Sequence, residues 1–124
     1  MKLTSRNEIG LFDINLDTGE CYWSFELKGL LGLPHDVPAE FHLLLQRIHP
    51  DDRRAFCKTA MQPFRAGCPR HIALEFRVLH NDGGVHWLHT ERRIIMREAN
   101  SEDVVRIVGF VLEIAEPSGL LRAA

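Results

Sequence analysis

The stretch IHPDDR, residues 48–53, holds the densest group of side chains that could do chemistry. His49 stands close to two adjacent carboxylates, Asp51 and Asp52, a combination that could serve acid–base catalysis or bind a metal. The same residues could begin a helix, because Pro50 suits the first helical position and acids there face the positive end of the helix dipole. Consecutive helical side chains point about 100° apart, so the two carboxylates do not converge on one atom. We therefore predict a structural helix start, with Asp52 reaching back to the cap at His49 as in a capping box.

Other side chains with chemical potential lie farther along the chain. His86 and His89 are three residues apart on a predicted strand, so they face opposite sides and cannot share a metal. Cys57 and Met61 share one face of a predicted helix, where core packing is the expected role of both soft, apolar side chains. These residues predict no metal site and no catalytic site.

The elements that must position these groups follow from hydrophobic spacing and from turn residues. Residues 9–24 predict a β-hairpin, and residues 26–34 predict a short helical piece. Residues 38–48 and 50–66 carry apolar side chains at helical spacing, and Pro63 should kink or end the second of these helices. Three strand-like segments follow, of which the first alternates and the last is nearly all apolar, and tight turns join them into an antiparallel meander. This order predicts an α+β domain with helices on one face of an antiparallel sheet.

Size and composition narrow the class of protein. The chain has 124 residues, the size of one domain, and 45% of them are hydrophobic, which is enough to bury a core. A net charge of −2 argues against a nucleic-acid surface. Three cysteines without a C-x-x-C pair, no signal peptide and no apolar run of bilayer length favour a cytoplasmic protein without direct membrane contact. Residues 117–124 are typical of a linker toward a downstream domain, which leaves residues 8–116 as the folded domain.

Several stretches resemble, in order, the motifs of PAS domains that carry PAC-type strands. LDTGECYWS resembles the first hairpin of that family, LKGLLGLP the short helix after it, and IHPDDR the start of the long helix. LEFRVLHNDGGVHWL resembles the central hairpin, and IVGFVLEIAE resembles the closing strand, although Glu113, Ile114 and Ala115 replace the usual Asp-Ile-Thr. The resemblance implies a five-stranded antiparallel sheet with helices on one face. It also implies a sensory role, often in one chain with a histidine kinase, a diguanylate cyclase or a phosphodiesterase.

The resemblance allows flavin binding to be tested on this sequence. Flavin-binding LOV domains carry a reactive cysteine before the long helix, and Leu43 falls at about that place here. They also line the inner strands with Asn and Gln, and the matching positions here are Val78, Leu88 and Val111. We therefore expect no flavin.

Haem binding is tested in the same way. Haem-binding sensors of this family usually place an axial histidine on the long helix, but no histidine occurs between Pro50 and Arg70. His42, on the preceding helix, is the remaining histidine, and its expected role is a hydrogen-bonded side chain beside apolar neighbours. We therefore expect no haem.

An apolar pocket between the helices and the inner sheet face is the alternative to a filled core. Because protein interiors are densely packed, the filled core is favoured. A pocket would suit a small apolar or amphipathic molecule, with His86 as its inward polar group. Its walls would be Phe56, Cys57, Ala60, Met61, Leu74, Phe76, Val78, Leu88 and Val111.

The opposite face of the predicted sheet is too apolar for a solvated surface, which marks an interaction site. We predict a homodimer through this face, anchored by Trp87 and Phe110 on adjacent strands, as the PAS resemblance also implies. The alternative is that the segment from Leu3 to Glu8 folds across it. The residues assigned to this face are Val85, Trp87, His89, Val108, Phe110, Leu112 and Ile114.

Three functional interpretations remain open at this point. The first is a non-enzymatic sensory module that binds a small ligand. The second is a ligand-free module that dimerises and transmits a signal. The third is a small α+β enzyme with His86 or His49 as its base, although the sequence offers no nucleophile–base pair and no phosphate-binding loop. Converging polar groups in a cavity would favour the third, and a filled core would favour the second.

Overall fold

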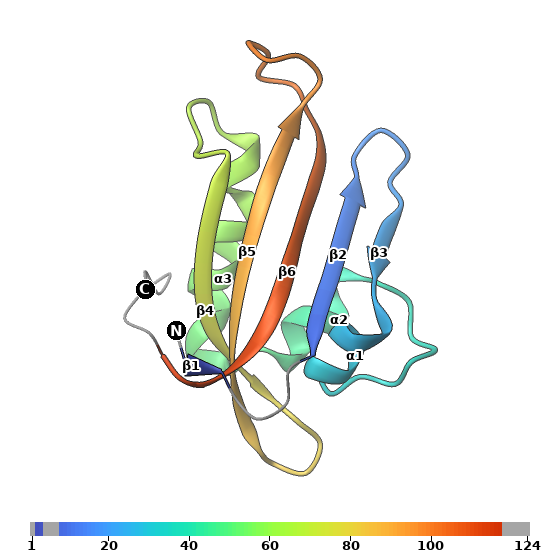
Figure 1. Cartoon of the computed structure of the whole chain (residues 1–124), viewed down its shortest axis with the longest axis vertical. Coiled ribbons are helices and arrows are strands. Elements are labelled where there is room, and N and C mark those ends of the chain that lie inside the picture. The colour runs from blue at the N-terminus through green and yellow to red at the C-terminus, as the bar shows by residue number, and fades with distance from the viewer. Residues whose placement is uncertain (1, 4–7, 118–124) are drawn as a thin grey trace.

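The computed structural model describes residues 2–3 and 8–117 and has an antiparallel sheet with helices against one face (Figure 1). Five strands follow the order β3-β2-β6-β5-β4, and the short β1 pairs with β6. The predicted α+β architecture is therefore confirmed. The strands are β1 (Lys2–Leu3), β2 (Ile9–Asn15), β3 (Cys21–Trp23), β4 (His71–Leu79), β5 (Val85–Met96) and β6 (Val104–Glu116). The helices are α1 (Phe25–Leu30), α2 (Phe41–Arg47), α3 (Pro50–Met61) and the single 3-10 turn η1 (Gln62–Phe64).

Strand β6 lies at the centre of the sheet, between β2 and β5 (Figure 1). Its register with β5 places Thr90 opposite Val111 and Glu91 opposite Phe110. Because side chains alternate along a strand, the first pair faces the helices and the second pair faces away from them. Strand β6 therefore contributes to both faces along its whole length.

Helix α1 begins at a cap that also ties it to the sheet. Ser24 Oγ accepts hydrogen bonds from the backbone N–H groups of Leu27 at 3.2 Å and Leu11 at 2.9 Å. Gly10 lets the helix approach β2, because a Cβ at this position would lie 2.8 Å from Leu27 Cα. The close approach buries the apolar side of α1 against the sheet.

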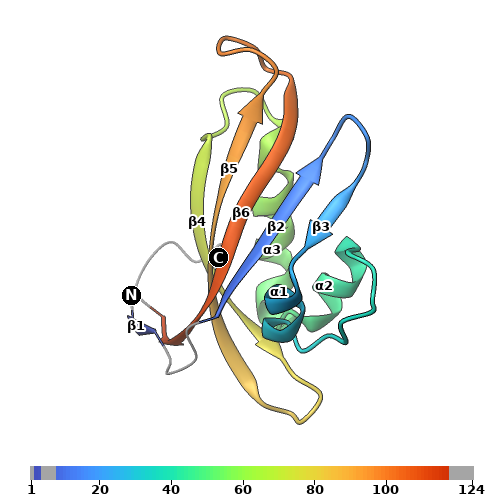
Figure 2. The same cartoon turned by 45° about the vertical axis from the view of Figure 1, so that its right-hand side comes forward.

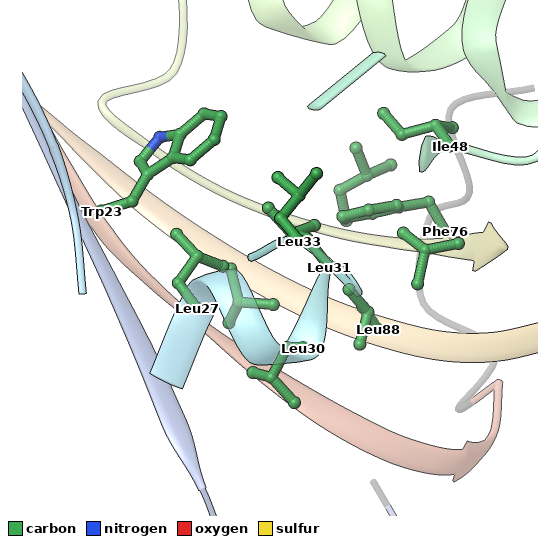
Figure 3. Close-up of a cluster of buried hydrophobic side chains, with 11 residues drawn as sticks. Trp23, Leu27, Leu30, Leu31, Leu33, Ile48, Phe76 and Leu88 are labelled. Carbon is green, nitrogen blue, oxygen red and sulfur yellow. The ribbon is translucent and has the colours of Figure 1, made fainter. Parts of the chain in front are cut away.

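A compact apolar core fills one end of the space between helices and sheet (Figure 3). Val78 of β4 and Leu88 of β5, near the turn between these strands, are fully buried in it. Each side chain buried in this way stabilises the fold by roughly 1.5–3 kcal/mol. The helix and loop residues that meet these strands are Leu27, Leu30, Leu31, Leu33 and Ile48, and Trp23 of β3 joins the same cluster.

Helix α3 starts at IHPDDR, as predicted, but one of its contacts differs from the prediction. His49 is the N-cap and its Nδ1 accepts from the Asp51 N–H at 3.1 Å, with Pro50 in the first turn. The predicted capping contact of Asp52 is wrong. Its carboxylate instead accepts from Arg77 of β4, at 2.9 Å from the backbone N, 3.0 Å from Nε and 2.7 Å from Nη2. An edge strand offers this free N–H together with a guanidinium, so the carboxylate bonds a distant strand rather than its own cap.

The end of the long helix follows the prediction. Helix α3 stops at Met61, and Pro63 lies in the following 3-10 turn η1. Two predictions concern the chain ends. The segment from Leu3 to Glu8 was the alternative cover of the outer sheet face, and its residues 4–7 lie outside the described residues. Residues 118–124 of the predicted linker also lie outside them. In the described ranges, no helix has the length and apolar character needed to cross a membrane.

Candidate functional site

A cavity of about 310 Å³ lies between the inner sheet face and the helices. It extends along Ile72 of β4 and Arg92 of β5, away from Val78 and Leu88 near the β4–β5 turn, and it shares Leu74 and Phe76 with the apolar core. Helices α1 and α2 gather at one end of β2 and β3 (Figure 2). The expectation of a filled core is therefore wrong for this part of the domain, because the side chains of α1, α2 and α3 that face the sheet there do not fill the space.

Six of the ten residues predicted as pocket walls line this cavity. The long helix contributes Phe56, Ala60 and Met61, and the strands contribute Leu74, Phe76 and Val111. Sequence reasoning missed the contribution of the β2–β3 hairpin, from which Phe12 and Trp23, among others, face the same space. The alternation along β2 and β3 was the signal that could have found them.

Four predicted wall residues lie elsewhere. Val78 and Leu88 belong to the compact core and are fully buried, and Cys57 on α3 does not reach the cavity. His86 faces the helix side but lies at the turn end of β5, where its Nδ1 is 2.8 Å from Glu113 Oε2. Its ring also stacks on His80, with centroids 3.8 Å apart. His86 is therefore not the inward polar group of the cavity.

Aromatic side chains form one wall of the cavity and mark its opening. The rings of Phe41, Phe56 and Phe76 follow one another, with centroid distances of 6.3 and 4.9 Å. Phe41 is 49% exposed, while Met61 and Phe64, also on the wall, are 55% and 59% exposed. The cavity therefore reaches the solvent between α2 and the segment from the end of α3 into η1.

Polar groups on the wall are few and mostly bonded to the backbone. Thr59 Oγ1 donates to the Ala55 carbonyl at 3.2 Å, and Thr90 Oγ1 donates to the Phe110 carbonyl at 2.9 Å. Burial raises the pKa of the Cys21 thiol, which disfavours a thiolate there. The described wall contains no histidine, aspartate or glutamate, so it offers no acid–base pair. The converging polar groups that the enzyme interpretation requires are missing from this wall.

The family profile described as PAS fold matches residues 20–111. The chain belongs to the PAS family. Sensor protein FixL of Bradyrhizobium diazoefficiens is 29% identical to this PAS domain over 108 residues, covering 87% of this chain and 21% of that protein. The chain thus spans 21% of the length of the curated relatives it matches. This PAS domain is therefore similar to a sensory module of a longer protein.

Solved structures show the same fold. A sensory box histidine kinase/response regulator from Burkholderia thailandensis E264 is 27% identical, with a TM-score of 0.61, and the match covers 86% of this chain and 76% of that one. The N-terminal domain of a diguanylate cyclase with PAS/PAC sensor from Marinobacter aquaeolei is 21% identical, with a TM-score of 0.69, covering 86% of this chain and 94% of that one. Both solved structures therefore share the fold of this PAS domain.

The residues of this PAS domain do not fit a histidine-ligated haem. His42 on α2 has a side chain that is 64% exposed, and its Nδ1 lies 3.2 Å from Glu40 Oε2 at the surface. No histidine is found on the described cavity wall. His42 therefore lies outside the space in which a cofactor would sit.

The residues of this PAS domain do not provide the LOV pattern for flavin either. Leu43, at the place of the reactive cysteine, packs as a partly buried apolar residue against the core. Val78, Leu88 and Val111 face the helices and are apolar, so the inner strands provide no amide side chains at these positions. The wall is suited to an apolar molecule instead.

The outer sheet face of the PAS domain is part apolar surface and part buried polar network. His89 is 1% exposed, with Nδ1 3.0 Å from Glu75 Oε2 and Nε2 2.8 Å from Glu91 Oε2. The hydrogen bond from His89 and a second contact to His71 lower the pKa of Glu91. Ile114, opposite Trp87, is also 1% exposed. His89 and Ile114 were assigned to a partner contact, but they are already buried within the chain.

The remaining residues assigned to the outer sheet face do lie on it, but Trp87 and Phe110 are farther apart than predicted. Val85 is 53% exposed, and Val108, Phe110 and Leu112 are partly exposed. Trp87 lies opposite Ile114 and Phe110 opposite Glu91, so the two predicted anchors share a face without being direct neighbours. Strands β2 and β3 add exposed apolar residues that sequence reasoning missed, namely Ile9, Leu11 and Tyr22.

Proposed function

We propose that this PAS domain is a sensory module of a multidomain signal-transduction protein and that it binds a small apolar molecule in its cavity. The cavity of about 310 Å³ with a mostly apolar wall is the observation that carries this proposal. Ligand pockets in proteins have about this size or more and are mostly apolar with a few polar groups. A ligand would also restore contacts that the wall atoms lack on the cavity side.

The output domain is inferred from the relatives. Proteins with a similar domain include a sensor protein, a histidine kinase/response regulator and a diguanylate cyclase. We infer a histidine kinase, or a cyclase or phosphodiesterase, elsewhere in the full-length protein, with no catalytic step in this domain. The three free cysteines support a reducing compartment such as the cytoplasm.

Cavity binding can be tested by filling the cavity from the long helix. Ala60 lies on the wall, whereas Ala55 on the same helix is partly buried away from it, so Ala60→Leu and Ala55→Leu form a matched pair. Native mass spectrometry of freshly purified protein, with 1-octanol added as a probe, should show a bound molecule in the wild type and in Ala55→Leu. Ala60→Leu should reduce that species. If the wild type carries no molecule through purification and does not bind 1-octanol, ligand sensing is contradicted.

We also propose that the outer sheet face forms a homodimer. Leu11 is 50% exposed and lies opposite Phe110, and Ile9 and Tyr22 extend the same apolar surface with 53% and 58% exposure. Exposed apolar surface of this kind, next to a buried polar network, supports a partner contact. Strands β2, β3 and β6 would form its centre, rather than the surroundings of Trp87.

Sedimentation tests the dimer with another matched pair. Leu11→Asp places a charge on the outer face, while Phe25→Asp places one at the first position of α1, where the exposed fraction of Phe25 is 61%. We expect Leu11→Asp to shift the protein toward monomer and Phe25→Asp to leave the distribution unchanged. A wild type that stays monomeric at high concentration would contradict the proposal.

A further inference from the structure

Arg92 is the single charged residue on the described cavity wall. It lies in the middle of β5, opposite Gly109 of β6 and Ile72 of β4, and the alternation of the strand turns it toward the helices. Its neighbour Arg93 is exposed and faces the other way, opposite Val108. Two adjacent arginines therefore lie in very different surroundings.

The guanidinium of Arg92 is poorly matched by the protein around it. Nη2 donates to the Thr59 carbonyl in the last turn of α3, at 2.5 Å. Nε is buried and has no hydrogen-bond partner, and no carboxylate among the described residues pairs with the side chain. A guanidinium carries five N–H donors, and among them the buried Nε–H lacks an acceptor. Burial lowers the pKa of Arg92, yet an arginine side chain stays charged at neutral pH.

Arg92 is partly buried and lines the cavity, and its buried Nε–H without an acceptor is costly. The two wall hydroxyls, Thr59 and Thr90, already donate to backbone carbonyls, so they leave Arg92 as the main donor toward a ligand. Gln62 Oε1 is likewise buried without a partner, but Gln62 does not line the cavity. An acceptor that enters the cavity would supply the partner that Arg92 Nε lacks.

We propose that the cavity takes an amphipathic monocarboxylate whose carboxylate pairs with Arg92 and whose apolar chain lies along Phe56 and Phe76. This inference rests on the proposed ligand-binding function. A planar carboxylate matches the guanidinium fork, which can donate two parallel hydrogen bonds to it. The apolar remainder of the wall selects a ligand with one charged end. At roughly 30 Å³ per atom, the share of liquid volume that one water occupies, a cavity of about 310 Å³ holds about ten non-hydrogen atoms, the size of octanoate.

The alternative role of Arg92 is structural. Its contact with the Thr59 carbonyl satisfies an acceptor at the negative end of α3, as basic residues near helix C-termini do. In that role Arg92 would stabilise the fold and would not distinguish a charged ligand from a neutral one. The two roles therefore differ in ligand selectivity.

The test compares octanoate with 1-octanol by titration calorimetry at neutral pH. Wild type and the control Arg93→Met should bind octanoate at least about tenfold more tightly than octanol, the ratio expected for hydrogen bonds to a charged group. Arg92→Met should abolish this preference while it binds octanol with unchanged affinity. In wild type, the NMR signal of the Arg92 Nε–H group should move with octanoate and stay in place with octanol. These wild-type measurements decide the matter even if Arg92→Met fails to fold.

Two results would overturn the inference in different ways. Equal affinity of wild type for octanoate and octanol, with the Nε–H signal unmoved by octanoate, refutes the Arg92 anchor and leaves the apolar cavity as the ligand site. Binding of neither probe refutes the anchor and also contradicts ligand sensing.

Discussion

Replacing Asp52 by alanine tests whether this carboxylate joins α3 to the sheet. The carboxylate accepts three hydrogen bonds from Arg77, and the side chains of the two residues are 9% and 22% exposed. Breaking a fully buried ion pair costs about 3–5 kcal/mol, whereas an exposed pair contributes about 0–1 kcal/mol. The released Arg77 guanidinium can reach solvent and still lies over the Trp87 ring, 5.4 Å from its centroid. Its backbone N–H loses its acceptor as well, so we expect Asp52→Ala to lower the free energy of unfolding by about 2–3 kcal/mol.

Asp51 provides the control, because it is the adjacent residue in the same helical turn. Its side chain is 77% exposed, and its replacement by alanine removes mainly a dipole interaction of about 0.3–1 kcal/mol. Urea denaturation measures both variants, with the midpoints compared at an unchanged m-value. A double-mutant cycle with Arg77→Met should give a coupling energy above about 1 kcal/mol. Equal losses for Asp52→Ala and Asp51→Ala, with no coupling to Arg77, would refute the tertiary contact.

Three further predictions concern acid stability, backbone conformation and colour. The hydrogen bond from His89 lowers the pKa of Glu91 below its usual 4.5, so its stabilisation is present above that value and is lost as the pH falls through the lower folded pKa. Glu91→Gln should therefore flatten the decline of the unfolding free energy below about pH 4.5, and an unchanged decline would contradict this role. Gly32→Ala should lower the unfolding free energy by at least about 1 kcal/mol more than Gly83→Ala. Both glycines have positive φ, but only at Gly32 would an added Cβ meet a neighbour, at 2.9 Å from His80 Cδ2. Equal losses of unfolding free energy in the two variants, measured by denaturation, would argue against that clash. The purified protein should show neither a flavin triplet nor a Soret peak, and either band at stoichiometric level would overturn the expectation of no such cofactor.

The order of elements could be predicted because each boundary depends on local chemistry. Alternation marks β4, a nearly all-apolar run marks β6, and the NDGG turn fixes the hairpin between β4 and β5. The helix start at His49 and its end near Pro63 follow from residues within one turn of each boundary. The two-residue β1 was not predicted, since two residues carry no periodic pattern.

The contacts of the site were less accessible from sequence because they join distant segments. Asp52 has a plausible local role at the cap, and its actual partner Arg77 lies 25 residues away. Arg92 shares strand parity with Leu88 and Thr90, which predicts an inward side chain, but an arginine inside is an exception to the usual distribution of charges. Whether the space around it is filled depends on side-chain volumes and helix placement, which no alternation pattern encodes.

The alternation along the central strand has a thermodynamic consequence. Ile107 and Val111 of β6 face the cavity, while Phe110 and Leu112 face the outer surface, so one strand borders both proposed binding events. If a change in the twist of β6 links them, ligand binding and self-association become coupled equilibria. Such coupling is reciprocal: the factor by which the ligand tightens the dimer is the factor by which the dimer tightens the ligand. The apparent affinity of the module for its signal would then depend on the number of copies that the cell contains.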